Sequence, residues 1–139
     1  MDVNTTIKLC GSGLAAQRTR MEVVAENLTH AQTTRTPEGG PYKRKVVTLA
    51  GEDVYFRDRL DDAVKEVKVD AITASSDGFK TIHDPAHPDA DANGNVLMPN
   101  VEVMNEMVDI ITVARAYEAV TTAFDATKNM ALKTLDLGK

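Results

Sequence analysis

The stretch 103–135, VMNEMVDIITVARAYEAVTTAFDATKNMALKTL, decides the fold of this chain. Its apolar residues recur at alternating intervals of four and three, which is the spacing of one face of a long helix packed on another helix. We call this series the C-terminal ladder. Its members are Val103, Met107, Ile110, Ala114, Tyr117, Phe124, Ala131 and Leu135, with Thr121 and Lys128 as weak steps. Asn100 is a plausible N-cap for this helix.

Beside this ladder runs a second apolar row on the same stretch. The row comprises Met104, Val108, Ile111, Val120, Ala123 and Met130. Together the two rows make a stripe wider than a two-helix contact needs, so we expect the C-terminal helix to have several neighbours.

A matching N-terminal ladder lies at the other end of the chain. Its members are Val3, Ile7, Cys10, Leu14, Met21, Val24, Leu28 and Ala31, and only Gln17 interrupts the series. We expect a helix from about Asn4 to Ala31 that pairs antiparallel with the C-terminal helix. Gly11 and Gly13 either bend this helix or let another backbone approach it closely, and the sequence leaves both possibilities open.

Between the ladders the pattern changes twice. The segment 33–42, TTRTPEGGPY, ends the helix with Pro and Gly. Short runs at 45–50, 53–56 and 66–72 then indicate strands, and 83–100 is rich in turn residues. We therefore predict an α+β fold, in which two long terminal helices form a coiled-coil-like inner domain beside a small β-rich module. The expected divisions are an N-terminal helix at 1–31, a connector at 32–45, the β-rich module with its turn-rich end at 46–100, and a C-terminal helix at 101–139.

Composition excludes several functional classes. The 139 residues carry a formal net charge of -5, so the chain lacks the basic footprint that nucleic acid binding needs. Its single cysteine excludes an internal disulfide. No apolar run approaches the roughly 20 residues of a membrane span. The N-terminal residues do not resemble a cleavable secretory signal, so we expect any export to use another route.

Two strings resemble ligand sites, and neither supports one. The segment 89–94, DADANG, copies the first half of an EF-hand loop, but Asn100 stands where the closing bidentate Glu should be, so an Asx-rich turn is the better interpretation. His83 and His87 would meet only on a helix, and Pro85 prevents one. We expect no metal, no cofactor and no catalytic residue. The alternatives that remain are an assembling structural subunit and a cytoplasmic coiled-coil adaptor or chaperone.

Three segments resemble the bacterial flagellar axial proteins: SGLAAQRTRMEVVAENLTHAQTTRTPEGGPYKRK at 12–45, HDPAHPDADANGNVLMPNVEVMNEMVDIITVARAYEA at 83–119 and MALKTLDLGK at 130–139. The family's usual Asn-(Ile/Leu)-Ala-Asn turn is here Asn27-Leu28-Thr29-His30, so a histidine replaces an amide.

The resemblance implies a structural subunit of the proximal rod of the flagellar basal body, used in motility. Such a subunit is exported by the flagellar type III apparatus without a cleaved signal peptide and assembles helically in the periplasm. There it transmits torque and forms the export channel wall. The implied partners are other copies of the chain, other flagellar rod proteins, the basal-body base and the export apparatus.

We predict that the two ladders are the assembly interface of this subunit. The residues expected there are Val3, Ile7, Cys10, Leu14, Met21, Val24, Leu28, Val103, Met107, Ile110, Ala114, Tyr117, Phe124 and Leu135.

Overall fold

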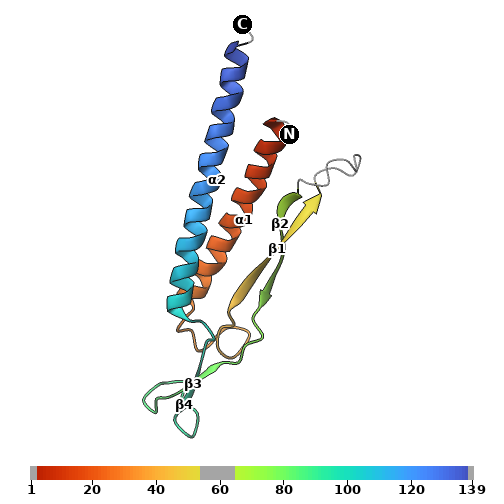
Figure 1. The fold of residues 1–139 in the computed structure, drawn as a ribbon. Coiled ribbons are helices and arrows are strands. Elements are labelled where there is room, and N and C mark those ends of the chain that lie inside the picture. Colours follow the sequence, from red (N-terminus) through yellow and green to blue (C-terminus); the bar gives the residue numbers. More distant parts are fainter. Residues whose placement is uncertain (1–2, 54–64, 138–139) are drawn as a thin grey trace. The chain divides into compact units, whose positions relative to one another are not determined.

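The computed structural model describes residues 3–53 and 65–137. The elements in chain order are α1 (Val3–Thr29), β1 (Lys45–Asp53), β2 (Lys65–Ala74), β3 (Lys80–His83), β4 (Asn95–Met98) and α2 (Val103–Leu137) (Figure 1). Strand β1 pairs with β2, and β3 pairs antiparallel with β4. Two long helices and a small sheet module confirm the predicted α+β fold. The part of the expected strand at 54–56 lies outside the described residues.

The chain divides into two compact units, and each contains part of both helices. We call the first the ribbon unit; it comprises Met1–Met21, Val47–Ala71 and Thr112–Lys139. The second, the hairpin unit, comprises Glu22–Val46 and Ile72–Ile111.

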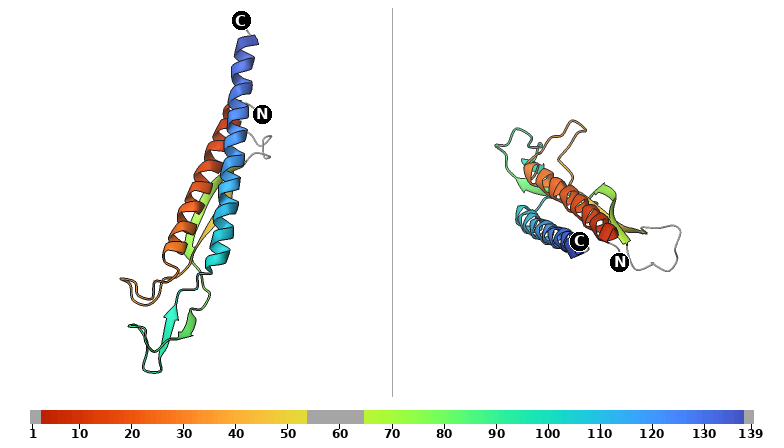
Figure 2. Two further views of the ribbon diagram at one scale, coloured as in Figure 1. Left: turned by 90° about the vertical axis from the view of Figure 1, so that its left-hand side faces the viewer. Right: turned by 90° about the horizontal axis from the view of Figure 1, so that it is seen from above.

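In the ribbon unit, α1 and α2 lie side by side and run in opposite directions, as we expected (Figure 2). A Cβ placed on Gly13 would lie 3.7 Å from a methyl carbon of Val120, so Gly13 lies against the partner helix. The Ser12 hydroxyl accepts a hydrogen bond from the Val67 amide at 3.3 Å and thereby joins α1 to β2. Gly11 and Gly13 both lie inside the continuous helix, so the expectation of a bend is wrong and close packing holds at Gly13.

The hairpin unit contains strands that the sequence did not predict. Strands β3 and β4 pair from Lys80 opposite Met98 to His83 opposite Asn95, within a segment expected to hold only turns. The turn between them is the expected Asx-rich one. The Asp91 carboxylate accepts hydrogen bonds from the amides of Asn93 at 2.8 Å and Asn95 at 2.9 Å, and Gly94 has a φ of 75°.

The start of α2 differs from the prediction. Asn100 does not cap the helix, because its side-chain oxygen accepts the Arg44 amide at 2.8 Å and its amide group donates to the Asp77 carbonyl at 3.0 Å. Helix α2 begins at Val103, and the carbonyl of Glu102 accepts the first helical amide at Glu106. Asn100 instead joins the connector to the residues before the helix.

The connector is a series of turns. The amide of Tyr42 donates to the Thr33 carbonyl at 3.1 Å, and the amide of Thr36 donates to the Gly40 carbonyl at 2.9 Å. Gly39 and Gly40 adopt φ values of 90° and 79°, which side chains disfavour. The chain is thus folded back, so that Tyr42 is buried immediately before β1.

Candidate functional site

The structure distributes the predicted interface residues over three degrees of burial. Cys10 and Val24 are buried. Half-buried members are Ile7, Leu14, Met21, Leu28, Ile110, Ala114 and Phe124. Exposed members are Val3, Val103, Met107, Tyr117 and Leu135. Most of the ladder positions therefore pack only in part within the subunit.

The faces buried within the subunit lie one residue before the ladder positions. On α1 the buried Ala16, Val23 and Asn27 precede Gln17, Val24 and Leu28. On α2 the buried Glu106, Val113 and Thr127 precede Met107, Ala114 and Lys128. One residue is about 100° of helix rotation, so each helix turns a partly polar face inward and keeps apolar ladder residues nearer its surface.

Asn27 is the centre of a buried polar cluster in the hairpin unit. Its side chain is 1% exposed. The side-chain oxygen accepts the Lys45 amide at 2.9 Å and the Tyr42 hydroxyl at 3.0 Å. The side-chain nitrogen donates to the Lys45 carbonyl at 2.9 Å and to Glu106 Oε2 at 3.2 Å. All four hydrogen-bonding positions of the amide are used, and the two bonds to Lys45 copy the pairing that a neighbouring strand would make.

Glu106 supplies the buried charge of this cluster. It is fully buried, and Arg44 Nε donates to its Oε1 at 2.5 Å while Asn27 occupies Oε2. Arg44 also reaches Asp109 at 3.4 Å. A buried carboxylate is tolerated only when it is paired and hydrogen-bonded, so removing either Asn27 or Arg44 leaves it under-satisfied.

Tyr42 completes the cluster from the connector. Its ring stacks on His30, with centroids 4.8 Å apart and planes inclined by 22°. Burial, together with the charges of Glu26 and Glu106, raises the pKa of Tyr42 to about 12. The hydroxyl therefore stays protonated at neutral pH and donates to Asn27. His30, which replaces the family's usual amide, also lies 3.1 Å from the Thr33 hydroxyl through Nδ1.

The cluster ties together the end of α1, the connector and the start of α2. Its polar groups satisfy one another, so its chemistry is structural. Elsewhere, His83 Nδ1 lies 3.2 Å from Asn95 Oδ1, whereas His87 accepts the Asp89 amide, so the two histidines do not share a ligand. Within 3–53 and 65–137, no three His, Cys, Asp or Glu side chains are placed to hold a metal ion. In the same ranges, no helix combines the length and apolarity that crossing a membrane requires.

Sequence reasoning missed Asn27, Tyr42, Arg44 and Glu106 as a group. Three of them lie within the 12–45 segment that resembles the axial proteins, and Glu106 lies within the 83–119 segment. The available signal was an acidic residue between the apolar Met104 and Met107. Apolar periodicity gives no weight to such a residue, so it could not identify the partners.

Comparison with known proteins defines the class of this subunit. Residues 92–137 match the family model for the C-terminal region of the flagellar basal body rod FlgEFG proteins. That match covers the turn before β4 and all of α2. The class is therefore the flagellar basal-body rod proteins.

Full-length relatives narrow the assignment. The flagellar basal-body rod protein FlgC of Bacillus subtilis is 41% identical, over 96% of this chain and 97% of the relative. The FlgC protein of Salmonella typhimurium is 39% identical over 94% of each chain, and that of Borreliella burgdorferi is 37% identical over 94% of this chain and 93% of its own. The chain belongs to the FlgC family. It is a structural subunit of the flagellar basal-body rod, and the adaptor or chaperone interpretation is set aside.

Proposed function

We propose that this subunit joins the proximal rod through the exposed and half-buried residues of its two ladders, without catalytic chemistry. The observation that carries this proposal is the apolar surface left on α2. Val103, Met107, Tyr117 and Leu135 are each more than a third exposed, although they continue the ladder that packs elsewhere in the fold. Burying one such side chain contributes about 1.5–3 kcal/mol, so assembly would recover free energy that the lone subunit leaves unused.

The proposed neighbours are other copies of the chain, other rod proteins, the basal-body base and the export apparatus. A rod that transmits torque needs subunits that resist shear between their helices. Two features of this chain supply such resistance: the close contact of Gly13 with Val120 in the ribbon unit and the saturated Asn27 cluster in the hairpin unit. Subunits packed in this way around an axis would also form the export channel wall.

The proposed location is the periplasmic rod, reached by flagellar type III export with the N-terminal segment retained. The physical support is that α1 begins at Val3, and Cys10 is already buried. Cleavage that removed the first turns of α1 would take away part of the surface that packs on α2 and β2.

Mass spectrometry of purified hook-basal bodies tests this proposal. We expect the chain to be present with a peptide that covers the first turns of α1. The matched control is the same preparation from cells that lack the gene for this chain. Absence from otherwise intact basal bodies would overturn the proposed assembly, and a mature chain that starts within α1 would overturn the proposed export route.

A further inference from the structure

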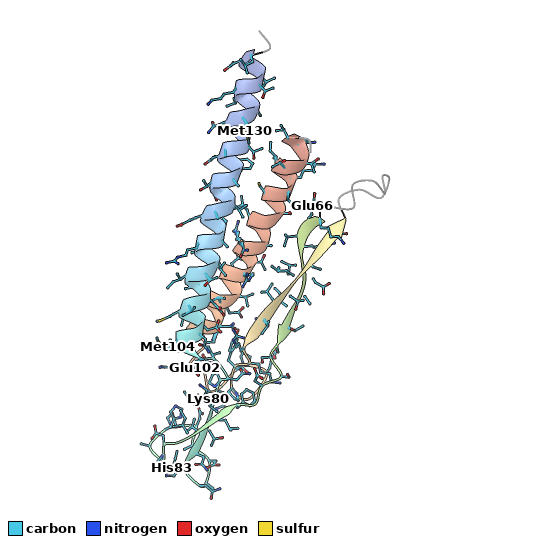
Figure 3. The ribbon with its side chains drawn as sticks, viewed as in Figure 1. Glu66, Lys80, His83, Glu102, Met104 and Met130 are labelled. Carbon is cyan, nitrogen blue, oxygen red and sulfur yellow. The ribbon has the colours of Figure 1, made fainter. Side chains whose placement is uncertain are left out.

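Two exposed apolar surfaces lie at opposite ends of α2. Near its start, Met104, Val108 and Ile111 are 68%, 60% and 53% exposed and follow one another at intervals of four and three. We call these residues the entry stripe. Near its end, Leu132 and Leu135 are 50% and 69% exposed and follow Lys128 at the same intervals. We call Lys128, Leu132 and Leu135 the exit stripe. Met104 marks the start of the helix and Met130 its last turns in Figure 3.

An acidic pocket borders the entry stripe in the hairpin unit. It has a volume of about 450 Å³ and shares Val108 with the stripe. Its lining is Arg44, Asp77, Asn100, Glu102, Asn105, Val108 and Asp109, so three carboxylates face one guanidinium. Lys80 donates to Glu102 at 2.6 Å, and this hydrogen bond holds the pKa of Glu102 below its ordinary value. The carboxylate therefore remains charged at neutral pH.

The exit stripe has the complementary chemistry. Lys128 is exposed, and among the described residues no ion pair engages it. It precedes the two leucines by four and seven residues, so all three lie on one face of the helix. The entry stripe thus offers apolar residues beside carboxylates, and the exit stripe offers apolar residues beside an ammonium group.

The spacing of the two stripes allows one register for parallel helices. When Leu132 of one copy is set beside Met104 of another, Leu135 falls beside Met107 and Lys128 falls beside Asn100, one turn or less from Glu102. In this register the ammonium group reaches the acidic pocket while the leucines cover the entry stripe. A contact between different surfaces of identical chains is heterologous, and repeating it extends an assembly along the helix direction.

We propose that the exit stripe of one subunit docks on the entry stripe and acidic pocket of a second copy of this chain, head to tail. This inference deepens the proposed function and rests on it. It differs from the general ladder contact because it pairs named residues at the two ends of α2. It also assigns Lys128, the weakest step of the C-terminal ladder, to an intermolecular ion pair.

Cysteine cross-linking tests the pairing. Two variants of the full chain, Met104→Cys and Leu135→Cys, each carry Cys10→Ala and different mass tags. They are mixed and oxidised at low salt. We expect a mixed disulfide dimer, loss of that dimer when Lys128→Glu is added to the Leu135→Cys chain, and weakening of the dimer as salt is raised. The control is Ala126→Cys, an exposed position on the opposite face of α2.

Each other outcome overturns the inference. Dimers of only one variant would indicate a symmetric contact, and equal yield with Ala126→Cys would indicate random collision. No dimer at all would also count against the pairing. The same cysteines in basal bodies separate this result from the proposed function. If the chain is incorporated but cross-links only to another rod protein, the second copy is the wrong partner and rod membership stands. If the chain is absent, the proposed function itself fails.

Discussion

Replacing Asn27 by alanine should destabilise the hairpin unit strongly, because this one side chain satisfies four other polar groups. The change removes hydrogen bonds to the Lys45 amide and carbonyl, to the Tyr42 hydroxyl and to Glu106 Oε2. Alanine is a better helix former than asparagine, so local helix propensity works slightly in favour of the variant. Any loss of stability therefore reports the cluster.

The magnitude follows from the four partners. The Lys45 backbone groups are half-buried and can bind water in the variant, so each loses about 0.5–1.5 kcal/mol, the net worth of an ordinary hydrogen bond. The bond to the charged Glu106 is worth about 1.5–3 kcal/mol, and Arg44 stays in place to limit the damage. The Tyr42 hydroxyl can rotate toward entering water. We expect a total loss of about 3 kcal/mol, within a range of roughly 2–5, since such contributions are not additive.

Hydrogen exchange with urea titration measures this loss. Amides at 22–29 and 103–111 should exchange faster in Asn27→Ala, with the opening free energy reduced by the expected amount. Thr29→Ala is the matched control, because Thr29 is exposed on the same helix and its hydroxyl bonds only the Ala25 carbonyl, so its effect should stay within about 0.5 kcal/mol.

Asn27→Asp separates hydrogen bonding from the loss of side-chain volume. The new carboxylate would stand about where Nδ2 now lies 3.2 Å from Glu106 Oε2. Two buried carboxylates at that distance share a proton, so the folded-state pKa of the pair rises above the unfolded value. The variant should therefore be less stable at pH 7 than at pH 5 relative to the native chain. If Asn27→Ala matches Thr29→Ala, or Asn27→Asp shows no recovery in acid, the cluster does not hold this unit together.

Three further predictions test other parts of the molecule. Gly11→Ala should raise the free energy of unfolding by about 0.5–1 kcal/mol, because nothing lies within 4 Å of the new Cβ, whereas Gly13→Leu should lower it by about 1–3 kcal/mol by pressing on Val120; thermal unfolding of both variants compares them, and equal effects would refute the close contact. The pKa of Tyr42 is raised to about 12, so its contribution to stability is complete below pH 10 and is lost as pH rises toward 12; Tyr42→Phe should show a shallower fall across this window in urea titrations, and parallel curves would contradict the assignment. Ile110→Asp places a charge in the C-terminal ladder and should abolish motility and rod incorporation while strands outside α2 stay folded by hydrogen exchange, with the exposed Thr122→Asp as control; a motile Ile110→Asp strain would remove Ile110 from the interface.

The apolar ladders by themselves determined that two long helices exist and that they occupy the ends of the chain. Periodic Val, Ile, Leu and Met residues leave few other ways to remove so much apolar surface from water. The Asx-rich turn was also predictable, because Asp91 and Gly94 act through neighbouring backbone groups. The family resemblance rested on local strings as well, and the full-length relatives agree with it.

Only the tertiary structure decided which face of each helix turns inward and what holds the helix ends. Asn27, Gly13 and Glu106 are polar or small, so an apolar pattern assigns them to the surface, and their burial depends on partners far away in the sequence. Asn100 resembles a helix cap until Arg44 and Asp77 compete for its side chain. Strands β3 and β4 were hidden because pairing between short segments depends on register across a turn and not on composition. Local periodicity is encoded in neighbouring residues, whereas hydrogen-bond satisfaction in a core depends on residues that meet only after the chain has folded.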